Sequence, residues 1–99
     1  MLRLEEIPDW IINLTEDDLA FIKKFILSSG SLKDLAKEYD ITYPTLRNRL
    51  DKLIEKIKVY EKSIDDPYIE KIKVLAIEDK IDIETAKALI NEYRRSKKW

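Results

Sequence analysis

The sequence has no cysteine and no histidine among its 99 residues. These absences exclude disulfides, thiol chemistry, histidine acid–base catalysis and zinc sites built on Cys or His ligands. The chain also contains a single glycine, so it has no glycine-rich phosphate loop. We therefore expect a protein that is not an enzyme and that requires no cofactor or metal.

Long apolar runs are absent as well. None approaches the roughly 18 residues that a membrane-spanning helix requires, and no charged-then-apolar leader opens the chain. We expect no membrane span and a soluble protein of the cytoplasm, a compartment that the lack of cysteine also fits.

Charge is abundant but unevenly distributed. Asp, Glu, Lys and Arg make up 39% of the chain, well above the roughly 25% of an average globular protein. The 19 basic and 20 acidic residues nearly cancel, leaving a formal net charge of −1. Residues 43–58, in contrast, hold five basic and two acidic side chains. The overall balance argues against a generic polyanion binder, whereas this local basic segment suits contact with phosphate.

Helical periodicity and capping signals predict an all-α protein with five or six helices. Thr15 and Asp18 resemble a capping box before a helix at 16–27, and Gly30 stands where a helix end needs a positive φ. Asp66 and Asp82 begin two further helices that should form an antiparallel hairpin. The expected buried stripes are Leu19, Ile22, Phe25 and Ile26 on helix 16–27, and Leu46, Leu50, Leu53, Ile54 and Ile57 on helix 43–58.

Residues 32–53 have the organisation of a helix-turn-helix, with two helices separated by three or four residues. Ala36 is small where the helices must approach closely, and Asp40 takes the turn position usually given to glycine. Ile41 plugs the angle between the helices, while Leu46 and Leu50 anchor the second one. The pattern alone leaves both DNA binding and an accidental helical corner open.

A resemblance to a known family narrows this choice. The stretch that carries it is Thr42-Tyr43-Pro44-Thr45-Leu46-Arg47-Asn48-Arg49-Leu50-Asp51-Lys52-Leu53-Ile54. It resembles the signature of a helix-turn-helix group of uncharacterised prokaryotic proteins, the domain-of-unknown-function family numbered 2089, and the similarity extends over about residues 7–58. Many relatives carry an N-terminal zinc ribbon, for which this chain lacks the cysteines. The resemblance implies a transcription-factor-like fold, a three-helix core followed here by the helical hairpin.

The expected recognition helix spans residues 43–58, and its first turns would enter the major groove of double-stranded DNA. Arg47 is the candidate base contact, because its guanidinium can pair with both acceptors of guanine, and Asn48 has the same capacity for adenine. Tyr43, Thr45 and Lys52 are better placed for phosphates. The full set of candidate DNA-binding residues is Thr42, Tyr43, Pro44, Thr45, Arg47, Asn48 and Lys52.

Structural interpretations compete along this helix. Arg49 lies beside the apolar stripe, so it can cover the core and pair with an acid such as Glu38 or Asp34. Tyr43 is either a packing residue that steers the turn or a phosphate contact. Asp51 and Glu55 lie one turn apart on the exposed side and would repel phosphate, so only the first half of the helix is expected to reach DNA.

The C-terminal hairpin, residues 65–97, follows a helix-turn-helix domain of residues 1–60. Its first helix is apolar on most sides, so a single partner helix cannot cover it. The apolar surface that remains uncovered packs either on a second copy of the chain, which gives a homodimer, or on helix 16–27. The basic tail from Arg94 to Trp99 could follow DNA or an anionic membrane surface, and the alternative is a frayed, solubilising tail.

These observations predict a sequence-specific DNA-binding protein that regulates transcription as a homodimer, and no small-molecule ligand is evident from the sequence. The alternative is a protein-interaction or adaptor module that keeps the helix-turn-helix fold without binding DNA. The net charge of −1 and the acids Asp51 and Glu55 favour that alternative.

Overall fold

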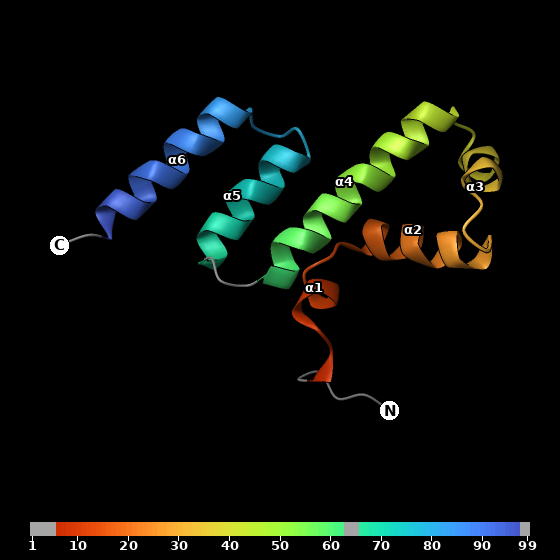
Figure 1. Cartoon of the computed structure of the whole chain (residues 1–99), viewed down its shortest axis with the longest axis horizontal. Helices are drawn as coiled ribbons and strands as arrows, with labels where there is room; N and C mark the ends of the chain where they lie inside the picture. The colour runs from red at the N-terminus through yellow and green to blue at the C-terminus, as the bar shows by residue number, and fades with distance from the viewer. Residues whose placement is uncertain (1–5, 63–65, 98–99) are drawn as a thin grey trace.

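The structure, a computed structural model, describes residues 6–62 and 66–97, and these form six helices and no strand. In chain order the helices are α1 (Asp9–Ile12), α2 (Glu16–Leu27), α3 (Leu32–Tyr39), α4 (Tyr43–Lys62), α5 (Pro67–Ile77) and α6 (Ile83–Ser96). Figure 1 shows α4, α5 and α6 lying side by side, with α1, α2 and α3 along the other flank of α4. The predicted all-α class is confirmed.

The helix starts are fixed by local side-chain caps, as the sequence predicts. The hydroxyl of Thr15 accepts the N–H of Asp18, and the carboxylate of Asp18 accepts the N–H of Thr15, both at 3.1 Å, which is the predicted capping box. The hydroxyl of Ser31 accepts the N–H of Asp34 and so caps α3. Asp66 and Asp82 accept backbone N–H groups at the starts of α5 and α6.

The turn after α2 requires left-handed backbone at two consecutive residues. Ser29 and Gly30 have φ values of 57° and 78°, so the positive φ predicted for Gly30 is confirmed and Ser29 shares it. The N–H of Gly30 donates to the carbonyl of Phe25 at 2.9 Å, and the hydroxyl of Ser28 donates to the same carbonyl at 2.8 Å, so this acceptor at the helix end is satisfied.

The core lies where α2, α3 and α4 meet. Leu35 and Leu46 have no exposed surface, and Phe21 has only 1%. The complete buried cluster is Leu14, Phe21, Leu35, Ala36, Leu46 and Leu53. All six precede residue 60, so the helix-turn-helix part of the chain supplies its own core.

The predicted buried stripe of α2 is wrong in part, because Leu19 and Ile26 are 40% and 67% exposed whereas Phe21 is buried. Leu19 and Phe21 are two residues apart, so they point to nearly opposite sides of a helix with 3.6 residues per turn. α2 is apolar on both sides, and aromatic rings bury the most apolar surface. The side with Phe21 and Phe25 therefore faces the core, and the ring of Phe21 stacks on Tyr39 with centroids 6.0 Å apart.

The helix expected over residues 43–58 is longer than predicted, since α4 continues to Lys62. Leu46 and Leu53 of its predicted stripe are buried, and Leu50 and Ile57 are half-buried against the same core. Ile54 departs from the prediction, with 37% of its surface exposed.

The predicted hairpin is present, and it packs on α4. Figure 1 shows α5 between α4 and α6, antiparallel to both, and Ile69, Ile72 and Val74 of α5 are buried. The hairpin therefore packs on α4, and not on helix 16–27, which was the intramolecular partner considered from the sequence. α6 continues to Ser96, so the start of the basic tail is helical rather than frayed, and residues 98–99 lie outside the described residues.

The molecule is flat. Its extents are 53 × 37 × 17 Å, and its radius of gyration of 16.1 Å exceeds the about 13 Å of a compact chain of this length. A flat arrangement leaves more helix surface exposed than a compact one would.

Candidate nucleic-acid interface

The turn between α3 and α4 has the geometry that the helix-turn-helix pattern predicts. Asp40 adopts φ 55° and ψ 48°, the left-handed conformation for which glycine is the usual residue. The next N–H, that of Ile41, donates to the carbonyl of Ala36 at 3.0 Å and closes α3. Ile41 is half-buried against the core, and Leu46 anchors the first turns of α4 with no exposed surface.

The start of α4 is capped by Thr42. Its hydroxyl accepts the N–H of Thr45 at 3.3 Å and donates to the hydroxyl of Thr45 at 2.9 Å. Pro44 stands in the first turn, where an N–H would have no helical partner. Two of the candidate residues thus have a structural role, while the positive end of the helix dipole remains available to an anion.

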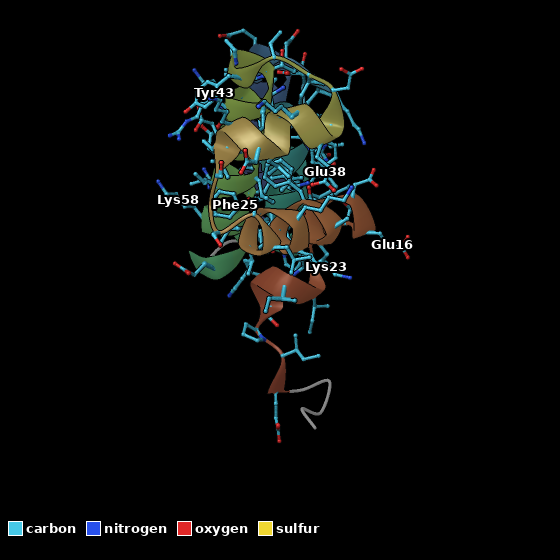
Figure 2. All side chains as sticks on the ribbon, turned by 90° about the vertical axis from the view of Figure 1, so that its right-hand side faces the viewer. Glu16, Lys23, Phe25, Glu38, Tyr43 and Lys58 are labelled. Atoms are coloured by element: carbon cyan, nitrogen blue, oxygen red, sulfur yellow. The ribbon has the colours of Figure 1, made fainter. Side chains whose placement is uncertain are left out.

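Six of the seven candidate residues are exposed together at this end of α4. Tyr43 has 51% of its surface exposed, which leaves its ring accessible to a phosphate, and Figure 2 shows it projecting from one side of the molecule. The exposed set is Thr42, Tyr43, Pro44, Thr45, Arg47 and Asn48.

Lys52, the seventh candidate, is placed differently. It is half-buried, and its ammonium forms an ion pair with Asp79 in the turn between α5 and α6. The structure therefore separates Lys52 from the other six residues and places it where the hairpin meets α4.

Two arginines on α4 have contacts of different kinds. Arg47 Nε lies 3.2 Å from Asp51 Oδ1, one helical turn away, and both side chains are about half exposed. Arg49 packs over the core, as the structural interpretation expects, but aromatic rings take the place of an acid. Its guanidinium lies 4.9 Å from the ring centroids of Phe21 and Tyr39.

Lys56 is a buried cation that the sequence analysis did not single out. It is 4% exposed, and its Nζ lies 2.5 Å from Asp18 Oδ2 and 2.8 Å from Glu78 Oε2. Burial lowers the pKa of Lys56, but the two carboxylates outweigh burial and raise it above its ordinary 10.5. One feature of the sequence indicates that Lys56 is buried. Lys56 and Tyr60 are spaced i, i+4 and continue the edge of the apolar stripe of this helix.

Two lysines of α3 also went unnoticed in the sequence. Glu38 reaches Lys24 of α2 at 3.6 Å, so that flank of α3 faces α2. Lys33 and Lys37 are exposed and lie about 140° and 100° around the helix from Glu38. They lie on a different side of the helix from Glu38 and have no ion-pair partner among the described residues.

Within residues 6–62 and 66–97, no three acidic side chains gather in a way that could hold a metal ion. No helix in those ranges is long and apolar enough to cross a bilayer.

Comparison with known families agrees with the helix-turn-helix geometry described above. Residues 14–60 match the model of the family described as "Domain of unknown function (DUF2089)-HTH", which confirms the resemblance seen in the sequence. The matched segment runs from the start of the core at Leu14 to Tyr60 near the end of α4. Neither the curated proteins nor the solved structures contain a significant match.

Proposed function

We propose that the helix-turn-helix domain of the DUF2089 family, carried by residues 14–60, binds duplex DNA through the first two turns of α4. One observation carries the proposal: six polar, aromatic or proline residues, Thr42 to Asn48 apart from Leu46, are exposed together at a capped helix N-terminus. A helix-turn-helix presents this part of its second helix to the major groove.

Each exposed side chain has a role in this proposal. Arg47 donates to the two acceptors of a guanine, and Asn48 pairs with an adenine. An exposed i, i+4 ion pair stabilises a helix by only about 0.3–0.5 kcal/mol, so Asp51 releases Arg47 at little cost. Lys33 and Lys37 of α3 contact phosphates and fix the orientation of the domain on the duplex.

Transcriptional regulation in the cytoplasm, by a homodimer on two half-sites, completes the proposal. Two copies related by a two-fold axis would place their α4 helices about 34 Å apart, in successive turns of one groove. This step rests on the general geometry of helix-turn-helix dimers.

Fluorescence anisotropy with random and selected genomic duplexes tests the proposal. Log affinity should fall with log salt concentration by about 0.9 per neutralised phosphate, and Lys33→Gln should reduce the slope by about 1. Arg47→Ala should weaken binding to the preferred site by about 1–3 kcal/mol. The matched control is Arg95→Ala, which removes an exposed arginine that is also paired within its own helix, with Glu92. Equal loss of affinity in the two variants would contradict the assigned interface.

A protein-interaction module is the second candidate function, and the contacts made by the α4 cations favour it. Of the five cations in residues 43–58, Arg47, Lys52 and Lys56 are paired with carboxylates and Arg49 covers two aromatic rings. The basic segment therefore presents less free positive charge than its sequence indicates. If no duplex binds even at low salt, the adaptor function replaces DNA binding.

A further inference from the structure

A mainly apolar groove of about 390 Å³ lies where α4, α5 and α6 meet. Its volume falls within the range of small-molecule sites, and such sites are mostly apolar with a few polar groups at fixed places. Each of the three helices contributes apolar and charged side chains to the wall. The lining residues are Glu55, Lys58, Val59, Lys73, Ala76, Ile77, Ile83, Ala86, Lys87 and Ile90.

The groove exists because small residues stand between larger ones. Ala76 of α5 and Ala86 of α6 leave space that Ile77 and Ile90 border. Ile83 is 64% exposed at the groove, although a side chain of this size is among those most often buried. The flat shape of the molecule leaves this surface without a further layer of helices.

The charge around the groove is predominantly positive. Lys58, Lys73 and Lys87 come from α4, α5 and α6 respectively, and Glu55 is the one acid among the lining residues. Lys58 and Lys87 are exposed and have no ion-pair partner in the part of the chain that the structure describes. In a protein whose acids and bases nearly balance, cations from three helices around one apolar surface favour an anion with an apolar body.

We propose that this groove binds a medium-chain alkyl carboxylate. The alkyl chain covers the apolar floor at Ala76, Ile83 and Ala86, and the carboxylate lies at the rim between Lys58 and Lys87. Burial of the chain supplies the binding free energy in rough proportion to the apolar area covered, and the lysines select the sign of the head group. The groove is separate from the proposed DNA interface. Figure 2 shows Lys58 on the same side of the molecule as Tyr43, but further from the N-terminal end of α4.

Titration calorimetry of the full chain with decanoate, below its micellar concentration, is the direct test. We expect saturable binding of one decanoate per chain. Decyltrimethylammonium, which has the same alkyl chain and the opposite charge, should bind at least tenfold more weakly. Equal affinities for the two amphiphiles, or no saturable binding of decanoate, would overturn the proposal.

Variants separate the head-group contact from the floor. Lys58→Gln/Lys87→Gln should weaken decanoate binding about tenfold, whereas Lys23→Gln/Lys71→Gln, with the same change in net charge away from the groove, should leave it unchanged. Ile83→Glu should abolish binding, and a carboxylate in the first turn of α6 suits the helix dipole, so the variant should fold. Circular dichroism checks that it does.

Two outcomes would assign the groove differently. If both lysine pairs affect decanoate equally, the rim does not recognise the carboxylate and the proposal fails. If sedimentation shows a dimer that Ile83→Glu dissociates, and decanoate does not bind, a second copy of the chain occupies the groove and the proposal is overturned.

Discussion

Replacing Lys56 by methionine should destabilise the protein more than any other removal of a charge in the described structure. Methionine keeps the apolar stem but leaves Asp18 without its cation and Glu78 with only the exposed Lys80, whose Nζ lies 3.7 Å from Glu78 Oε1. Removing one partner of a fully buried pair costs about 3–5 kcal/mol. Because the side chains of Asp18 and Glu78 remain 18% and 23% exposed, water relieves part of that cost. We expect the free energy of unfolding in urea to fall by about 2–3 kcal/mol.

The pH dependence of stability gives a second measurement of the same cluster. Burial raises the pKa of Asp18 and of Glu78, but the hydrogen bonds and positive charge of Lys56 lower it. Together with hydrogen bonds from Thr15 to Asp18 and the charge of Lys80 beside Glu78, they outweigh burial and hold both pKa values below their ordinary 3.8 and 4.5. A carboxyl with a lowered folded-state pKa stabilises the fold above its ordinary pKa and loses that contribution as the pH falls through the folded value. The free energy of unfolding of the wild type should therefore decrease as the pH is lowered below 4.5. In Lys56→Met this decrease should be smaller.

At alkaline pH the dependence of stability on pH has the opposite sign. The pKa of Lys56 is raised in the folded state, so its contribution is complete below the ordinary value of 10.5 and is lost as the pH rises through the folded value. The difference in stability between wild type and Lys56→Met should stay constant from about pH 5 to pH 10 and shrink on both sides of that window.

Lys52→Met is the matched control, because Lys52 pairs with Asp79 on the same turn but Asp79 is 73% exposed. This exposed pair should contribute less than about 1 kcal/mol. The triple variant Lys56→Met/Asp18→Asn/Glu78→Gln should recover at least half of the lost stability, since the only charge left without its partner is Lys80, which is 66% exposed. Equal stability of the two methionine variants, or a triple variant less stable than Lys56→Met alone, would show that burial does not set the contribution of Lys56.

Three further predictions concern the helix-turn-helix itself, and urea unfolding checks each one. Leu46→Ala should cost about 2–5 kcal/mol because it opens a cavity at a fully buried position, whereas Ile54→Ala, at a position 37% exposed, should cost less than about 1.5 kcal/mol. Asp40→Gly should stabilise the protein by about 0.5–1 kcal/mol, because glycine adopts the observed left-handed conformation without strain. Thr42→Ala should cost about 0.5–2 kcal/mol through the lost cap of α4.

Helix starts and turns could be predicted because their signals are local. The capping box of Thr15 and Asp18, the positive φ of Gly30 and the left-handed turn at Asp40 each depend on a few neighbouring residues. The helix-turn-helix followed from the spacing of such signals, and the matching of residues 14–60 to a family of that class confirms it.

The orientation of α2 could not be predicted in the same way, because periodicity measures only the helix's own sequence. Leu19 and Ile26 form the exposed apolar side, Phe21 lies on the other, and Ile22 between them packs against the core. The neighbours decide between the two sides: Tyr39 of α3 and Arg49 of α4 offer a flat aromatic ring and a planar cation, and both lie against Phe21. These partners lie 18 and 28 residues further along the chain.

Charge in the candidate site was overestimated for a related reason. The basic segment 43–58 contains Lys56, yet that ammonium is buried between two acids that lie 38 residues before it and 22 residues after it. A net charge counted along the sequence treats every side chain as exposed. The structure shows instead that much of the positive charge of α4 binds other parts of the same chain.

Position along α4 therefore decides what each cation does. Lys52 and Lys56 lie one helical turn apart and contact Asp79 and Glu78, two consecutive acids at the end of α5. A cation already held by a carboxylate attracts phosphate less, and the acids of this turn repel phosphate themselves. Residues 42–48 precede Lys52 by about 6 Å or more along the helix axis. The acids of α4 alone predict that only its first half reaches DNA, and the docking of the α5–α6 turn gives a second and independent physical reason for the same limit.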